Sequence, residues 1–249
     1  MTRKLDGKVA VIIGGAGGIG AATAHALAAV GARVAVVGRD DPKQAKAIAA
    51  QLPGTGHLGL VTSITDSALL AALAGEVVEK LGRVDILVNA AGFTKPIPHH
   101  DLDALTDDFI DEMFEVNWRG QFATIRAFRK ALAATGDGLV VNVSSISGAN
   151  GIGSNIAYCA AKAGLDVMAV SLARALAPAI RVVNVAPGVV DTSFVPGRGA
   201  DFNDKVAATT PLGRIGTTAD IAAAIEACAT HLTFTTGVTL VTDGGRGLH

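Results

Sequence analysis

The stretch that decides the fold is Val9-Ala-Val-Ile-Ile13-Gly14-Gly-Ala-Gly-Gly18-Ile-Gly20, which continues into the alanine-rich segment 21–30. Five apolar residues in a row predict a buried strand, and the segment after the glycines has the length and composition of a helix. A turn without side chains lets backbone approach a ligand closely, and the helix start behind it offers N–H groups to an anion. The position of the glycines between a strand and a helix therefore predicts a pyrophosphate site.

Strand and helix signals alternate along the rest of the chain. Short runs rich in valine and isoleucine predict six further strands, at 33–37, 57–61, 86–88, 139–143, 181–185 and 238–241. Gly31 stands where the cap after the first helix is expected, and Asp41-Pro42 and Thr65-Asp66 are typical helix starts. This alternation predicts an α/β fold with seven parallel strands and helices on both faces, a doubly wound Rossmann arrangement in one domain spanning 1–249.

The amino-acid composition and the net charge limit the kinds of ligand that the protein is expected to bind. The 30 glycines in 249 residues exceed the usual share of about 7%, which indicates close packing of backbone. A net charge of -1 provides no basic surface for nucleic acid or an acidic membrane. Cys159 and Cys228 have no metal-site spacing, the six histidines form no zinc motif, and no apolar run approaches 18 residues. We expect a cytoplasmic protein without a metal ion.

Tyr158 and Lys162 suggest proton chemistry. They are four residues apart in an alanine-rich helical segment, so their side chains share one face about one turn apart. A unit charge at roughly 4 Å and an effective dielectric near 20 favours the phenolate by about 4 kcal/mol at the upper end. Such a phenol can exchange a proton with an alcohol or a carbonyl near neutral pH. Tyr158 is also the only tyrosine in the chain.

Several short elements occur in the order of one known family. They include Asn89-Ala-Ala-Gly92, Asn117, Ser144-Ser145, Tyr158-x-x-x-Lys162, Asn184-Val-Ala-Pro187-Gly188 and Asp243-Gly-Gly, besides the first glycine turn with its GxxxGxG spacing. With these elements the chain resembles the short-chain dehydrogenase/reductase family over nearly its whole length. The resemblance implies hydride transfer between a nicotinamide and a secondary alcohol or ketone. It also implies a homotetramer, with a dimer as the alternative, that acts on small molecules.

The resemblance assigns roles to four residues. Tyr158 would be the general acid and base, and Lys162 would hold the nicotinamide ribose and ease loss of the tyrosine proton. Ser145, thirteen residues before Tyr158, would hydrogen-bond the reacting oxygen, while Ser144 should point the opposite way. Asn117 would order a water chain that connects Lys162 to solvent.

The expected cofactor contacts lie in the loops after the strands. Besides Tyr158 and Lys162 they are Gly14, Gly18, Ile19, Gly20, Arg39, Ser63, Ile64, Asn89, Ala90, Gly92, Pro187, Gly188, Val190 and Thr192. Gly38 stands where family members that use NAD usually carry an aspartate, and Arg39 suits a 2′-phosphate. The sequence favours NADP(H), with NAD(H) as the alternative because Asp40 and Asp41 would repel a phosphate. Ile13, Ser63 and Ala90 depart from the family's usual residues and remove polar contacts around the cofactor.

The substrate pocket is expected to draw on Phe93, Ser147, Asn155 and Phe194, with residues 189–210 as a lid. Arg198 and Lys205 in that lid could meet an anionic group or could simply be solvated. Three alternatives stay open: a reductase of 3-oxoacyl thioesters, a dinucleotide sensor without catalysis, and a methyltransferase that uses the glycine turn for S-adenosylmethionine. The Ser145, Tyr158 and Lys162 set favours an oxidoreductase over the last two.

Overall fold

The computed structural model describes residues 5–197, 199 and 201–248. Within these residues seven strands form one parallel sheet in the order β3-β2-β1-β4-β5-β6-β7. The strands are β1 (Val9–Ile13), β2 (Arg33–Gly38), β3 (Leu58–Val61), β4 (Ile86–Asn89), β5 (Gly138–Val143), β6 (Ile180–Pro187) and β7 (Thr239–Thr242). The order reverses between β1 and β4, and ligands bind beyond such a switch point in open α/β sheets. The predicted doubly wound Rossmann fold is confirmed, and each strand lies within two residues of its expected bounds.

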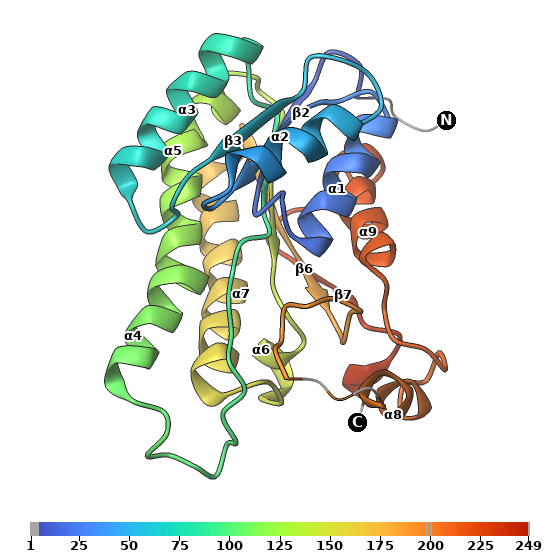
Figure 1. Cartoon of the computed structure of the whole chain (residues 1–249). Helices are drawn as coiled ribbons and strands as arrows, with labels where there is room; N and C mark the ends of the chain where they lie inside the picture. Colours follow the sequence, from blue (N-terminus) through green and yellow to red (C-terminus); the bar gives the residue numbers. More distant parts are fainter. Residues whose placement is uncertain (1–4, 198, 200, 249) are drawn as a thin grey trace.

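Helices cover both faces of the sheet (Figure 1). They are α1 (Gly18–Ala29), α2 (Pro42–Gln51), α3 (Ser67–Leu81), α4 (Asp107–Phe114), α5 (Gln121–Ala133), α6 (Ser147–Asn150), α7 (Ile156–Leu176), α8 (Phe202–Ala208) and α9 (Thr218–Thr230), with a π-helical segment at Glu115–Gly120 and a 3-10 turn at Arg246–Leu248. One apolar core joins α1, α2 and α9 to the sheet, and a second joins α3, α5 and α7 to its other face. Every residue of β1, β4 and β5 is buried, which explains why these strands show no polar alternation.

The helix boundaries follow the predicted capping signals. Asp41 and Asp66 accept backbone N–H groups at the starts of α2 and α3, and Gly82 ends α3 in the left-handed conformation. Gly31 follows α1 with φ 105°, a backbone angle that favours glycine. The first helix begins at Gly18, three residues before the expected Ala21, because the last glycines of the turn already have helical geometry.

Helix α7 forms the buried centre of one face. It is the described helix whose length and apolar composition would suffice to cross a bilayer, yet half of that stretch is buried inside the protein, as in many core helices. Lys162, Asp166 and Arg174 also interrupt its apolar residues. Cys159 on α7 and Cys228 on α9 are buried and unpaired.

The segment 189–210 lies beyond the end of β6. It contains an isolated bridge between Val190 and Gly216 and then the short helix α8, which lies beside the C-terminal end of the chain (Figure 1). Arg198, one of the two lid cations considered from the sequence, lies outside the described residues. Lys205 lies on α8, is well exposed, and pairs with Asp201.

Candidate active site

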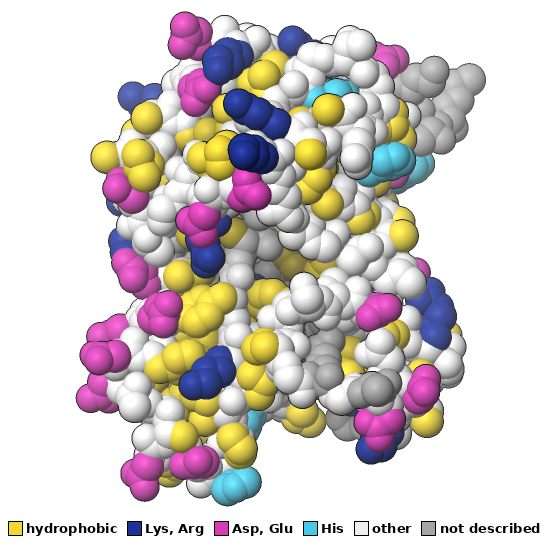
Figure 2. All heavy atoms as spheres, in the orientation of Figure 1, with side chains coloured by type: hydrophobic (Ala, Val, Ile, Leu, Met, Phe, Trp, Pro, Cys, Tyr) yellow, Lys and Arg dark blue, Asp and Glu magenta, His cyan; other side chains and the backbone are white. Residues whose placement is uncertain are grey.

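A cavity of about 1460 Å³ lies at the carboxyl ends of the strands. Its wall includes the loops after β1, β2, β3, β4, β5 and β6, together with α7 and the segment 189–210. Figure 2 shows the corresponding hollow near the middle of the face turned to the viewer. The cavity therefore lies at the topological switch point, where the order of the strands predicts a ligand.

The glycine turn after β1 forms one wall of the cavity. Gly14 has φ 78°, and a Cβ atom there would lie 2.6 Å from the backbone nitrogen of Ala91. A Cβ atom on Gly20 would lie 2.1 Å from the carbonyl oxygen of Gly14. Helix α1 begins behind this turn at Gly18, and its N-cap residue, Gly17, has no side chain to cap the helix. The turn is thus packed so closely that only backbone fits, and it presents a helix N-terminus to the cavity, which suits a pyrophosphate.

The residues after β2 form the part of the cavity expected to distinguish the two cofactors. The Arg39 side chain is 81% exposed and forms an ion pair with Asp40. Asp41 accepts the backbone N–H of Lys43 at 2.8 Å and begins α2. Of the two carboxylates expected to repel a phosphate, one is therefore engaged by Arg39 itself and the other by helix amides.

Tyr158 and Lys162 lie on the inner face of α7 and line the cavity together. The Lys162 Nζ lies 5.6 Å from the centre of the Tyr158 ring and donates a hydrogen bond to the Val143 carbonyl at 2.7 Å. Burial lowers the pKa of Lys162 to about 8, while Asp166, one turn further along α7, opposes this shift. The lysine can thus change its charge near neutral pH next to the only tyrosine.

The two serines after β5 have different surroundings, although both line the cavity. Ser144 is buried, and its Oγ donates a hydrogen bond to the Lys162 carbonyl at 3.4 Å. The Ser145 Oγ is half-buried and accepts the backbone N–H of Ser147 at 3.1 Å. An oxygen that accepts from the backbone keeps its own hydrogen for another acceptor, so Ser145 is the serine suited to hold a reacting oxygen.

Asn117 lies behind the cavity wall, fully buried in the π-helical segment between α4 and α5. Its side-chain amide donates to the carbonyls of Phe93 at 3.0 Å and Met113 at 3.1 Å, and its oxygen accepts the Phe93 N–H. The extra residue in this helical turn interrupts the regular backbone hydrogen bonds of the helix, as π-bulges do. The side chain of Asn117 connects the π-helical segment to the loop after β4. The structure places Asn117 where it fixes this loop.

A ladder of asparagines crosses the sheet below the cavity. Asn89, Asn142 and Asn184 occupy paired positions on β4, β5 and β6, with hydrogen bonds of 3.0 Å between neighbouring side chains. Thr124 of α5 donates to Asn89 at one end, and Asn184 donates to Asp166 of α7 at the other. Asn89 is therefore a buried strut between two helices and does not line the cavity.

Asn155 also lies elsewhere than predicted. It is fully buried, accepts the Tyr158 N–H at 2.7 Å as the cap of α7, and donates to the Lys95 carbonyl at 2.9 Å. These bonds use its polar atoms at the helix start, so it does not line the substrate pocket but positions the turn that carries Tyr158.

The cavity wall contains the other predicted residues. They are Gly14, Gly18, Ile19, Gly20, Arg39, Ser63, Ile64, Ala90, Gly92, Pro187, Gly188, Val190 and Thr192 for the cofactor, and Phe93, Ser147 and Phe194 for the substrate. The wall also contains residues that the sequence did not single out, among them Gln44, Glu112, Glu115, Ile152 and Arg246. Of these, Arg246 alone directly follows a recognised element, Asp243-Gly-Gly.

Comparisons with known proteins agree with this geometry. A family model described as enoyl-(acyl carrier protein) reductase matches residues 14–246. The chain is 38% identical to a ketoacyl reductase of the granaticin polyketide synthase of Streptomyces violaceoruber, over 98% of this chain and 97% of the relative. It is 39% identical to cis-4-hydroxycyclohexanecarboxylate dehydrogenase of Sinomonas cyclohexanicum, over 96% of both chains.

Two further matches extend the comparison. The chain is 34% identical to the 3-oxoacyl-[acyl-carrier-protein] reductase of Escherichia coli, over 96% of this chain and 97% of that protein. The structure superposes on that of a short-chain dehydrogenase/reductase from Burkholderia xenovorans with a TM-score of 0.89 and 32% identity, covering 97% and 98% of the two chains. With the fold, the glycine turn and the paired tyrosine and lysine in place, the chain belongs to the short-chain dehydrogenase/reductase family of oxidoreductases.

Proposed function

We propose that this protein transfers hydride between NADP(H) and a secondary alcohol or ketone, with Tyr158 as the general acid and base. The observation that carries the proposal is that Ser145, Tyr158 and Lys162 line the same cavity as the glycine turn. A module that only binds a dinucleotide has no chemical need for these three side chains beside the cofactor site. A methyltransferase has none either.

The residues around the cavity fit a nicotinamide cofactor. The turn from Gly14 to Gly20 would take the pyrophosphate, and Thr192 would bond the carboxamide. The absence of a side chain at Gly18 keeps space between the glycine turn and Thr192, because a Cβ atom on Gly18 would lie 3.0 Å from the Thr192 Cγ2. When bound, the cofactor supplies or accepts the hydride.

The protein's own side chains would transfer a proton to or from the substrate oxygen. In reduction Tyr158 donates its phenolic proton to the substrate oxygen, which Ser145 holds by a hydrogen bond; in oxidation the proton moves back. A charged Lys162, whose Nζ lies 5.6 Å from the centre of the Tyr158 ring, favours the phenolate over the neutral phenol. A phenol that ionises more easily favours proton donation in reduction, and in oxidation a larger fraction of the tyrosine is ionised and can accept a proton.

Arg39 supports the preference for NADP(H). Its guanidinium lies at the cavity rim, where the loop after β2 would meet the adenosine ribose. Asp40 is its present partner, and a 2′-phosphate would compete for the same N–H groups with a larger negative charge.

A 3-oxoacyl thioester is a second candidate substrate. Two of the relatives described above are named as reductases of ketoacyl groups. The apolar residues Ile152, Phe194 and Phe202 in the cavity wall could accompany an acyl chain. The segment 189–210, which carries two of them, would then act as the lid.

The proposal includes the oligomeric state of the protein and its location in the cell. We infer a homotetramer, because Val167 and Val170 on the outer face of α7 are 67% and 36% exposed and can pack against a second copy. Two buried, unpaired cysteines suit the reducing cytoplasm.

A substrate screen tests the reaction class. Ketones, 3-oxoacyl thioesters and secondary alcohols are offered with each nicotinamide cofactor, and the absorbance of the reduced nicotinamide is followed. We expect turnover of at least one carbonyl compound, with faster reaction for NADP(H). Cofactor binding without turnover of any substrate in the panel would favour the sensor.

A further inference from the structure

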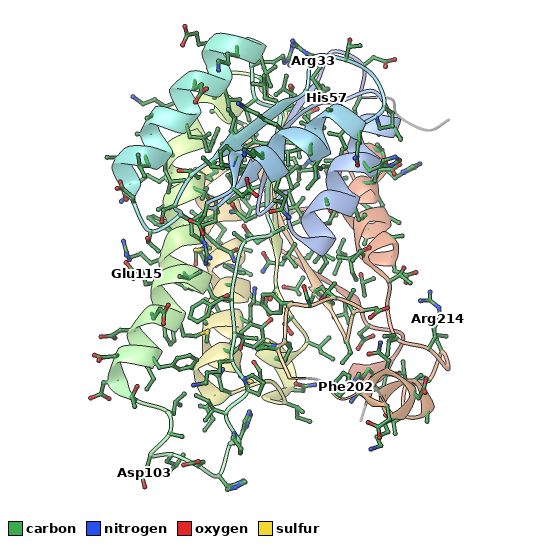
Figure 3. All side chains as sticks on the ribbon, in the orientation of Figure 1. Arg33, His57, Asp103, Glu115, Phe202 and Arg214 are labelled. Carbon is green, nitrogen blue, oxygen red and sulfur yellow. The ribbon has the colours of Figure 1, made fainter. Side chains whose placement is uncertain are left out.

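Arg246 is a cavity residue that none of the proposed catalytic steps uses. It begins the 3-10 turn after β7, is half-buried, and lines the cavity beside Phe202 and Thr209. Its guanidinium donates a hydrogen bond to the Thr209 Oγ at 3.0 Å. Figure 3 labels Phe202, which marks this side of the cavity at the start of α8.

The backbone around Arg246 is held in place. Gly244 and Gly245 both have positive φ, which turns the chain sharply back toward α8. The Asp243 carboxylate accepts the N–H groups of Gly245 at 2.8 Å and Gly247 at 2.6 Å, and Gly244 accepts the Leu212 N–H. Arg246 is therefore presented by a turn held by hydrogen bonds, and the Asp243 carboxylate of that turn is already occupied by backbone N–H groups.

The charges around the cavity leave Arg246 available. Among the described residues of the wall, the cations are Arg39, Lys162 and Arg246. Arg39 pairs with Asp40, and Lys162 is buried against the Val143 carbonyl. Arg246 contacts only the neutral Thr209 in the hydrogen bonds and ion pairs of the described chain. A half-buried guanidinium in this setting retains N–H donors for a ligand.

Four acidic residues of the described chain line the cavity, and two of them, Asp40 and Asp41, follow β2, which is five strands away from β7 in the sheet. Glu112 of α4 and Glu115 of the π-helical segment also line the cavity, and Figure 3 shows Glu115 far across the molecule from Phe202. Glu115 is paired with Arg119 and Asp40 with Arg39, whereas the Arg246 side chain has no acidic partner among the described residues, so an anionic substrate would be attracted to Arg246. Among the described wall residues, Arg246 is thus the cation that would draw the charge of a small anion toward the C-terminal turn.

We propose that Arg246 binds a carboxylate on the substrate, so that the protein acts on a hydroxy acid or keto acid. This inference rests on the proposed function and specifies its substrate class. Guanidinium N–H groups match the two oxygens of a carboxylate, and the apolar Phe194 and Phe202 nearby would cover the carbon skeleton. Arg246 would then determine specificity, while Tyr158 and Ser145 act on the alcohol or carbonyl.

Binding to the complex with NADP+ tests this directly. Calorimetry compares hexanoate and cyclohexanecarboxylate with their neutral amides, and coenzyme A serves as a phosphate-bearing probe. We expect the acids to bind the wild type and to lose about tenfold to hundredfold in affinity in Arg246→Met, as removal of a hydrogen-bonded charge does. The amides should bind both proteins equally.

Three further variants separate binding of the acid from support of the fold. Lys205→Met removes a positive charge from α8 outside the cavity and should leave acid binding within about twofold, since exposed charges contribute little. Arg246→Lys keeps the charge and loses the forked geometry, so an intermediate loss is expected. Thr209→Val removes only the neutral partner of Arg246 and should affect acids far less than Arg246→Met.

Several outcomes would overturn the proposal. They are no binding of either acid to the wild type, equal acid binding in Arg246→Met, an equal loss for acids and amides, or a larger loss for coenzyme A than for the acids. Failure of the proposed reaction gives a different result. If acids bind in a way that depends on Arg246 but no hydroxy or keto acid is turned over, the carboxylate site is supported and the proposed reaction is contradicted. If ketones are turned over at the same rate in the wild type and in Arg246→Met, and acids bind both equally, the proposed reaction is supported and the carboxylate site is contradicted.

Discussion

The Nζ of Lys162 lies 5.6 Å from the centre of the Tyr158 ring, one helical turn away on α7. The same ammonium donates to the carbonyl of Val143 at the end of β5, so the pair is fixed to the sheet as well as to the helix. Because Lys162 is 4% exposed, its charge is costly to keep, and Asp166 offsets only part of that cost. The tyrosine thus sits beside a lysine whose protonation is finely balanced.

This balance predicts a pH-dependent stability difference between the wild type and Lys162→Met. Burial lowers the pKa of Lys162 from 10.5 to about 8, so between these values the unfolded chain holds a proton that the folded protein has lost. The free energy of unfolding of the wild type should therefore rise with pH relative to the variant, by up to about 3 kcal/mol between pH 8 and 10.5. Urea titrations at several pH values measure it. A difference that stays constant or falls over this range would show that the lysine is not buried as a costly charge.

The two serines should respond differently to removal of their hydroxyl groups. Ser145→Ala should lower kcat by about a hundredfold or more, because its Oγ is the one left free to hold the substrate oxygen. Ser144→Ala loses a single bond to the Lys162 carbonyl and should cost about 1 kcal/mol of stability with kcat within about fivefold. Steady-state kinetics on both variants decide it, and the reverse order of effects would reassign the serine.

Alanine substitutions at two positions of the glycine turn should have different effects on stability. Gly20→Ala places a Cβ atom 2.1 Å from the Gly14 carbonyl, so the turn must shift, and we expect a loss of about 3 kcal/mol or more. Gly17→Ala is the matched control, since its Cβ atom would lie 3.4 Å from the nearest atom and its φ is -90°. Its stability should stay within about 1 kcal/mol of the wild type. Denaturant unfolding without cofactor compares them, and equal losses would mean that the turn is not tightly packed.

Arg39 should determine the preference between cofactors. Arg39→Ser is expected to lower kcat/KM for NADPH by about tenfold to hundredfold and to change the value for NADH by less than about threefold. Asp40→Asn should act in the other direction, because it frees the guanidinium from its ion pair. A wild type that prefers NADH, or an Arg39→Ser variant with an unchanged ratio, would contradict this role.

Local patterns in the sequence were enough to predict the frame of the site. The apolar run before Gly14 and the helix behind it predicted the glycine turn between β1 and α1, and a spacing of four predicted that Tyr158 and Lys162 share a face. Capping residues such as Asp66 placed helix boundaries correctly. Each of these features depends on neighbours within a few residues, where backbone geometry is decided locally.

The remaining features depend on residues far apart in the chain. Asn89 and Asn184 are 95 positions apart, and only the strand order shows that Asn142 joins them below the cavity. Asn155 was expected in the pocket, but tertiary hydrogen bonds to the loop after β4 make it a helix cap. Nor does any sequence pattern place Arg246 beside Thr209, which requires two left-handed glycines and the packing of α8.

The most direct measurement is the turnover of Tyr158→Phe on a substrate from the screen. Loss of the phenolic hydroxyl removes the only group proposed to transfer the proton, so kcat should fall by about a thousandfold, within the range of general acid and base catalysis. Since Tyr158 is the only tyrosine, loss of its ultraviolet titration identifies the variant, and an unchanged Tm and cofactor affinity establish that it is folded. A folded Tyr158→Phe that keeps a tenth or more of wild-type turnover would contradict the proposed mechanism.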